Sequence, residues 1–128
     1  MKKIGITGIN NFLGQHTVWL LRTLKEELEI IDLDKSFEKV DIVLHLASLS
    51  PKEIKKPEEI YEVNIGLARE LLENLEKLKI TPYIIFNSST QIRQDNPYGK
   101  SKKDIGEMLR EWGKAHSSPV TNLIIPNE

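Results

Sequence analysis

Residues 2–14 read KKIGITGINNFLG, in which a short apolar run ends at Gly8 and a further glycine follows at Gly14. The apolar residues of 2–7 predict a β-strand that stops at Gly8. Residues 14–27 then predict a helix. Its apolar residues recur at helical spacing: Val18, Leu20, Leu21 and Leu24, with Leu28 beyond. The stretch therefore predicts a strand, a glycine turn and a helix, the unit from which α/β folds are built.

The rest of the chain continues this alternation of short apolar and longer amphipathic segments. Residues 82–88 are nearly all apolar, as in a parallel strand that is covered on both faces. Further strands are expected at residues 28–32, 40–46, 82–88 and 120–125. Helices are expected after Pro57, with a stripe of Ile60, Val63, Leu67, Leu71, Leu75 and Leu78, and after Pro97, with a buried face of Ile105, Met108, Leu109 and Trp112. This order predicts a parallel sheet with helices on both faces.

The connection between the second and third strands is short. Residues 33–39 must return roughly 17–20 Å along the sheet, and extended chain covers about 3.3 Å per residue. An additional strand and helix do not fit into this connection. We therefore expect one domain over residues 1–128, a three-layer α/β/α fold whose doubly wound parallel sheet has about five strands in the order 2-1-3-4-5.

Composition excludes several classes of function. The 18 Lys and Arg residues balance 19 Asp and Glu residues for a net charge of −1, which argues against a nucleic-acid partner. Without cysteine there is no thiolate metal site, and His16, His45 and His116 lack the spacing of metal ligands. The apolar runs are too short to cross a membrane, and the glycine turn comes too early for a signal peptide. A soluble, cytoplasmic domain without a bound metal is expected.

The glycine turn has the features of a site for a pyrophosphate. Such a site needs a tight turn, close approach of the backbone and a helix N-terminus with free N–H groups. Gly8 and Gly14 suit the first and last positions, whereas the middle glycine is replaced by Asn11, whose side chain crowds the approach. An ordinary strand–turn–helix connection is the alternative interpretation.

Asp32 strengthens the case for a dinucleotide. It ends the second strand, close to the roughly 20-residue offset at which a carboxylate meets the adenosine ribose. An acid there accepts hydrogen bonds from both ribose hydroxyls and repels a 2′-phosphate, which favours NAD over NADP. Asp34 is a competing candidate, and Lys35 could partly compensate a 2′-phosphate. An acidic loop at the strand end is the alternative.

Ser89, Tyr98 and Lys102 form a constellation suited to carbonyl chemistry. Tyr98 and Lys102 are one helical turn apart, just after a strand that ends in hydroxyl residues. A phenol with a pKa of about 10 is a poor proton donor near pH 7 unless a cation stabilises its anion, and Lys102 would supply that charge. Ser89 could hold the substrate oxygen. The alternative is a helix with a half-exposed tyrosine and a solvated lysine.

Taken together, these motifs resemble the N-terminal part of an extended short-chain dehydrogenase/reductase, the NAD-dependent epimerase/dehydratase family. The resemblance covers essentially the whole chain and is greatest to the capsular-polysaccharide enzymes that reduce a UDP-linked 4-keto-6-deoxy-hexosamine. It is carried by ITG…FLG at residues 6–14, DIVLHLA at 41–47, NIG at 64–66, FNSSTQ at 86–91, QDNPYGKSK at 94–102, LRE at 109–111 and LIIPN at 123–127. The resemblance implies a Rossmann-like fold.

The resemblance also implies a role for individual residues. Tyr98 would be the general acid/base, Lys102 its pKa-lowering partner and a ribose ligand, and Ser89 the residue that binds the substrate oxygen. The cofactor, NAD or NADP, would contact Gly8, Asn11, Phe12, Leu13 and Gly14 at its pyrophosphate, Asp32 at its ribose, and Leu46, Ala47 and Ser48 along its path, with Asn64 nearby. His45 is expected to be a core residue of the third strand.

The implied function is that of the NAD(P)-binding domain of a nucleotide-sugar reductase, epimerase or dehydratase in surface-polysaccharide biosynthesis. Ile124 stands where many members carry an arginine, and the chain ends at Glu128, where the family continues into its substrate-binding part. We therefore expect that part to be missing. A truncated, non-catalytic binding module is one alternative, and completion by a partner chain is another. Self-association through the Trp112 region or the free edge of the fifth strand is also expected.

Overall fold

The computed structural model describes residues 1–24, 27–48, 56–89 and 96–125. The described residues form eight elements, in the order of strands and helices that the sequence pattern predicts. They are β1 (Lys2–Thr7), α1 (Phe12–Thr23), β2 (Leu28–Asp32), β3 (Ile42–His45), α2 (Pro57–Leu78), β4 (Tyr83–Ser89), α3 (Pro97–His116) and β5 (Val120–Ile125).

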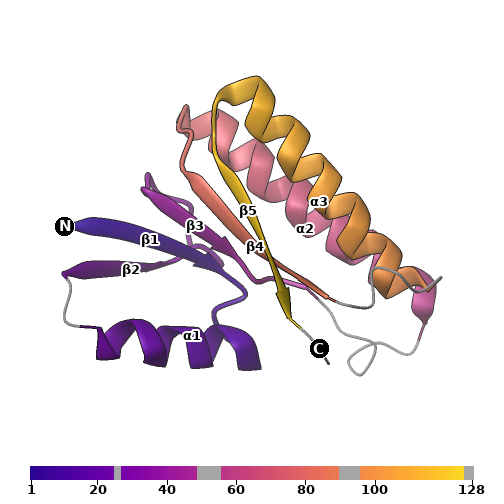
Figure 1. Ribbon diagram of the computed structural model, residues 1–128, viewed down its shortest axis with the longest axis horizontal. Helices are drawn as coiled ribbons and strands as arrows, with labels where there is room; N and C mark the ends of the chain where they lie inside the picture. Colours follow the sequence, from indigo (N-terminus) through magenta and orange to yellow (C-terminus); the bar gives the residue numbers. More distant parts are fainter. Residues whose placement is uncertain (25–26, 49–55, 90–95, 126–128) are drawn as a thin grey trace.

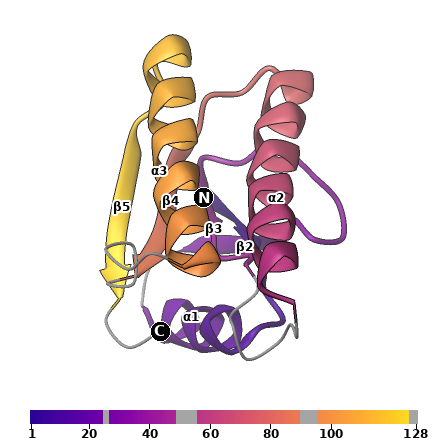
Figure 2. The same ribbon diagram turned by 90° about the vertical axis from the view of Figure 1, so that its right-hand side faces the viewer.

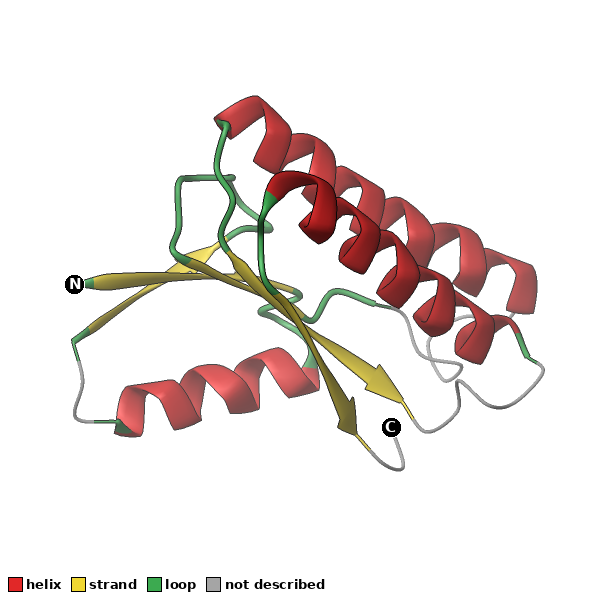
Figure 3. Ribbon diagram, turned by 45° about the horizontal axis from the view of Figure 1, so that its top comes forward, coloured by secondary structure: helices red, strands yellow, loops and turns green. Residues whose placement is uncertain are grey.

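The five strands form one parallel sheet in the order β2-β1-β3-β4-β5, which confirms the predicted order (Figure 1). One face is covered by α1 and the opposite face by α2 and α3, so the three-layer arrangement is also confirmed (Figure 3). The carboxyl ends of parallel strands meet at one edge of a sheet. The ends of β1, β3 and β4, with the described residues 46–48 after β3, therefore lie at that edge.

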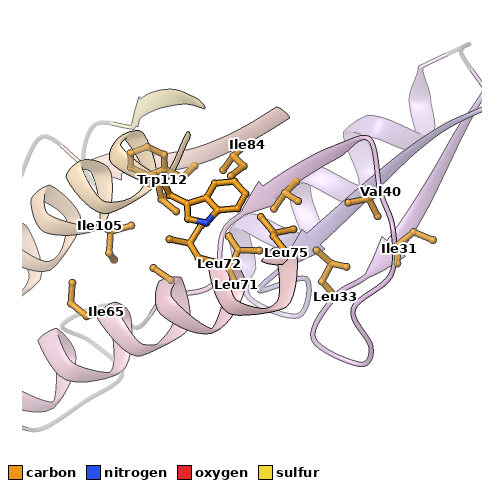
Figure 4. Close-up of a cluster of buried hydrophobic side chains, with 14 residues drawn as sticks. Ile31, Leu33, Val40, Ile65, Leu71, Leu72, Leu75, Ile84, Ile105 and Trp112 are labelled. Atoms are coloured by element: carbon orange, nitrogen blue, oxygen red, sulfur yellow. The ribbon is translucent and has the colours of Figure 1, made fainter. Parts of the chain in front are cut away.

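The larger part of the core lies between the sheet and the pair α2 and α3 (Figure 4). Val43 of β3 and Ile84 of β4 are completely buried, and they pack among Leu71 of α2 and Leu109 of α3. Figure 2 shows the two helices side by side. The Tyr61 hydroxyl also joins them, because it donates a hydrogen bond to the Asp104 carboxylate at 2.6 Å.

The opposite face has a smaller core, in which α1 packs on β1 and β3. Its buried members are Ile4, Ile6, Val18 and Leu46. In Figure 1, β4 and β5 extend away from α1, and the large apolar side chains Leu123 and Ile124 of β5 are exposed. Trp112 is buried, as predicted for the apolar face of the last helix, and its indole N–H donates to Glu76.

Several details of the predicted elements differ from the structure, and β4 also begins and ends one residue later than the predicted residues 82–88. Helix α1 begins at Phe12 and ends at Thr23, because Asn11 caps its start and Leu24 is already extended. Strand β3 is shorter than the predicted residues 40–46. On α2, Val63 is 37% exposed although it belonged to the predicted apolar stripe. The helix packs against both the sheet and α3, so its buried face extends to polar Asn64.

Candidate functional site

The turn between β1 and α1 requires both of its predicted glycines. Gly8 has a positive φ of 74°, and a Cβ there would lie 2.6 Å from the backbone nitrogen of Ala47. A Cβ at Gly14 would lie 2.1 Å from the Gly8 carbonyl oxygen. Only glycine allows this close approach of backbone to backbone. The tight turn expected from the sequence is therefore present.

Asn11 is the N-cap of α1, and its side chain is directed toward the protein. Its Oδ1 accepts a hydrogen bond from Gly14 N at 2.7 Å, and its Nδ2 donates to the Leu46 carbonyl at 3.1 Å. The first turn of a helix leaves N–H groups without intrahelical partners, here those of Phe12 and Leu13. Because the Asn11 side chain is held against β3, this helix N-terminus can accommodate an anion.

The acidic residue that ends β2, Asp32, and the one that follows it, Asp34, have different positions. Both oxygens of the Asp34 carboxylate accept from Gly8 N at 3.0 Å, and Oδ2 also accepts from Ile9 N at 3.1 Å. Asp32 accepts from the backbone N–H of Asp34 at 2.9 Å. The structure therefore brings Asp34, the competing candidate, to the glycine turn, while Asp32 holds the backbone of Asp34.

Tyr98 and Lys102 lie together in the first turns of α3. They are 2% and 3% exposed, so neither is the half-exposed or solvated side chain of the alternative interpretation. Asn96 caps the helix by accepting from Gly99 N at 2.7 Å, which fixes the start of this segment. The Lys102 ammonium lies 5.6 Å from the centre of the Tyr98 ring. A buried cation therefore accompanies the phenol.

The Lys102 ammonium connects α3 to two strand ends. It donates to Ser48 Oγ, after β3, and to the carbonyl oxygen of Asn87 in β4, both at 3.2 Å. The Asn87 contact could not be read from the sequence, because every residue has a backbone carbonyl. Ser89 is the last residue of β4, and its predicted side-chain role lies outside what the structure describes.

Asn64 lies behind the tyrosine, between α2 and α3. It is completely buried, and its Nδ2 donates to Ser101 Oγ at 3.4 Å. Ser101 in turn donates to the Tyr98 carbonyl at 2.7 Å. These contacts connect Asn64 to the backbone of the predicted catalytic segment.

Residues 46–48, which follow β3, connect the two halves of the candidate site. The Leu46 side chain is buried in the core under α1, and its carbonyl holds Asn11. The backbone of Ala47 contacts Gly8, and Ser48 contacts Lys102. The glycine turn and the Tyr98–Lys102 pair are therefore built against one short loop.

His45 is buried at the end of β3, as expected for a core residue. Its Nδ1 lies 2.8 Å from the Thr7 hydroxyl. Burial, with a smaller contribution from the Lys102 charge, lowers the pKa of His45 from 6.5 to about 3. The imidazole is therefore neutral near pH 7.

Within the described residues, no group of three or more His, Asp or Glu side chains is placed to hold a metal ion. No helix in this part of the chain combines the length and the apolar character that crossing a bilayer requires.

Comparison with known proteins gives matches over nearly the whole chain. The family model described as "NAD dependent epimerase/dehydratase family" matches residues 4–128. A curated relative from Pseudomonas aeruginosa, UDP-2-acetamido-2,6-beta-L-arabino-hexul-4-ose reductase, is 29% identical over 133 aligned positions. That alignment covers 98% of this chain and 35% of the relative. The chain thus spans about a third of the length of this relative.

Solved structures show the same fold. RMD from Pseudomonas aeruginosa, in complex with NADPH, superposes with a TM-score of 0.86 at 19% identity, covering 99% of this chain and 54% of that one. The capsular polysaccharide assembling protein CapF from Staphylococcus aureus has a TM-score of 0.64 at 26% identity, covering 93% of this chain and 34% of that one. The predicted Rossmann-like fold is therefore confirmed.

Proposed function

This chain belongs to the NAD dependent epimerase/dehydratase family, and on that premise we propose that it is the dinucleotide-binding domain of a nucleotide-sugar oxidoreductase. One observation carries the proposal. Residues 46–48 contact the glycine turn through Ala47 and the buried Lys102 through Ser48. The proposed pyrophosphate site and the proposed proton-transfer site would thus be held at a fixed separation on one sheet edge.

The residues at this edge fit a nicotinamide dinucleotide. Phe12 and Leu13 would bind the pyrophosphate through their backbone N–H groups, assisted by the dipole of α1. The Asp34 carboxylate would accept hydrogen bonds from the adenosine ribose, and Lys102 would donate to the second ribose. When bound, the cofactor supplies the two-electron oxidation or reduction of a sugar carbon.

Tyr98 would act as the general acid and base in this reaction. The Lys102 ammonium stabilises its phenolate over its phenol, because a positive charge in a buried site interacts strongly with a nearby anion. Ser48 and the Asn87 carbonyl hold that ammonium in place. Ser89 would bind the oxygen atom to which Tyr98 delivers its proton.

We further propose that NAD is preferred over NADP. Asp32 ends β2 and Asp34 follows it two residues later. Both contribute negative charge near the glycine turn. A 2′-phosphate on the adenosine ribose would be repelled there. Lys35, the basic residue nearest to these two aspartates in the sequence, is exposed.

The proposed substrate is a nucleotide sugar with a keto carbon, as the name of the curated relative suggests. A role in the biosynthesis of surface polysaccharide is proposed on the likeness to the capsular polysaccharide assembling protein. The proposal includes a substrate-binding part, which is supplied either within the same chain or by a partner. The same domain without turnover, a binding module, is the second candidate.

Isothermal titration with NADH and with NADPH tests the proposal. We expect NADH to bind, and the Lys102→Met variant to bind at least ten-fold more weakly. Lys103→Met is the matched control, since this neighbouring lysine is exposed, and its affinity should equal that of the wild type. Failure of both dinucleotides to bind at millimolar concentration would falsify the proposal. Turnover of a keto sugar that Tyr98→Phe abolishes favours the enzyme over the binding module.

A further inference from the structure

The outer face of α1 is aromatic and apolar. Phe12 is 89% exposed and Trp19 62%, and His16 lies between them on the same side of the helix. The centres of the Phe12 and His16 rings lie 6.4 Å apart, and those of the His16 and Trp19 rings 6.1 Å apart. Arg22 is the only charged residue of α1. A surface helix normally carries charged side chains on its outer face, whereas a helix that is apolar all round is normally buried.

A second uncovered surface lies on the same side of the sheet as α1, at β4 and β5. Ile84 and Phe86 pack in the core under α2 and α3, so Tyr83 faces the opposite side of the sheet. The Tyr83 hydroxyl is hydrogen-bonded to that of Thr121, which places Thr121 and, two residues later, Leu123 on this side as well. The core under α1 contains no residue of β4 or β5 among those that the structure describes, and both Tyr83 and Leu123 are exposed.

The two surfaces complement each other between two copies of the chain. A sheet of this kind is covered by helices on both faces, and each helix buries its apolar side against a neighbour. In the described part of one copy, α1 covers β1 and β3 and leaves β4 and β5 open on that side (Figure 1). When a second copy faces the first across α1, the helix of each copy can lie over β4 and β5 of the other. Both copies then use the same pair of surfaces, which closes the contact with two-fold symmetry.

The exposed apolar area is large enough for a stable dimer. The large apolar side chains exposed on the two surfaces are Phe12, Trp19, Leu20, Leu24, Tyr83 and Leu123. Since a buried aromatic side chain covers about 150–250 Å², these residues together expose roughly 600–700 Å² per copy. A pair of copies would bury about 1,300 Å², which lies within the range of about 1,200–2,000 Å² for specific interfaces. None of these side chains is charged, so the two-fold contact brings no like charges together.

We propose that the chain forms a two-fold dimer in which the outer face of α1 of each copy packs on the uncovered side of β4 and β5 of the other. This contact buries one face of the sheet through side chains. It therefore differs from pairing at the free edge of β5, which joins backbone groups. The dimer needs no bound dinucleotide, so it is tested separately from the proposed function.

Sedimentation velocity of the 128-residue chain at several concentrations tests the dimer. We expect Trp19→Lys and Tyr83→Lys each to raise the dissociation constant at least ten-fold, because each places a charge in the apolar contact. Tyr83 belongs to β4, which is paired on both sides, so its variant leaves the free edge of β5 unchanged. Val63→Lys is the matched control. It puts the same charge on an exposed apolar position of α2, on the other face of the sheet, and should dimerise as the wild type does.

Tryptophan fluorescence gives a second measurement that needs no variant. The chain has two tryptophans and Trp112 is buried, so acrylamide quenches mainly Trp19. We expect this quenching to decrease as the protein concentration rises and the dimer forms. A chain that stays monomeric overturns the proposal and leaves the surface to a substrate-binding part. A dimer in which Trp19 is quenched as in the monomer also overturns it and indicates pairing at the β5 edge. If the lysine variants do not fold, as circular dichroism would reveal, the quenching decides alone.

Discussion

Both oxygens of the Asp34 carboxylate lie 3.0 Å from the backbone nitrogen of Gly8. Asp32, which ends β2, accepts instead from the backbone N–H of Asp34. The residue predicted from its spacing to meet the ribose therefore supports its neighbour. Asp32 is the last residue of β2, whereas Asp34 lies in the turn that follows, where Lys35 N donates to the Asp32 carbonyl at 3.3 Å. The Asp34 side chain is therefore oriented by this turn and not by the alternation of side chains along a strand.

Asp34→Asn is expected to reduce the preference for NADH over NADPH at least ten-fold, because the carboxylate both anchors Gly8 and repels a 2′-phosphate. Asp32→Asn keeps the Asp34 carboxylate and should change the preference less. Titration calorimetry of both variants with both dinucleotides gives the comparison. A larger change of this preference in Asp32→Asn than in Asp34→Asn would indicate that Asp32, and not Asp34, binds the ribose.

Gly14→Ala is expected to destabilise the domain by about 1–3 kcal/mol, because its Cβ would overlap backbone atoms of Gly8 and Ile9. Gly66→Ala is the control. A Cβ at Gly66 in α2 meets nothing within 4 Å, and alanine favours a helix over glycine by about 0.5–1 kcal/mol. Urea unfolding of both variants should show changes of opposite sign, and a stable Gly14→Ala protein would contradict the turn geometry.

Stability is expected to fall as the pH decreases from about 6.5 toward 3. The pKa of His45 in the folded protein, about 3, lies below its ordinary value, so the unfolded chain binds the proton first. The contribution of neutral His45 to the free energy of unfolding is complete above pH 6.5. About 2 kcal/mol of it is lost between pH 7 and pH 5. Urea unfolding at several pH values measures it, and His45→Gln should remove this part of the slope. An equal slope in the variant would refute the assignment.

Self-association is expected through β5. This strand is at the edge of the sheet, with unpaired backbone groups, and its Leu123 and Ile124 side chains are exposed. Leu123→Lys should shift the protein toward monomer, since a charge blocks edge-to-edge pairing. Sedimentation velocity at several concentrations compares the two proteins. A wild-type chain that stays monomeric at high concentration contradicts the prediction.

Much of the fold could be predicted from local patterns. The glycine turn, the short connection over residues 33–39 and the two prolines that begin helices determine strand order and helix positions, because each acts through backbone geometry within a few residues. The buried face of α2 could not be predicted in full. Its position depends on how α3 packs against it, and Asn64 therefore replaces Val63 in the interior.

By itself, the sequence determined which side chains are available at the carboxyl edge of the sheet: the glycines of the first turn, Tyr98 with Lys102 one turn later, and two aspartates after β2. Only the tertiary structure decided which of them meet. Lys102 donates to a serine that follows β3 and to a backbone carbonyl of β4. Asp34 accepts from Gly8 N across the β1–β2 pair. Such contacts join residues far apart in the chain. They arise from strand pairing and helix packing, which no local spacing specifies.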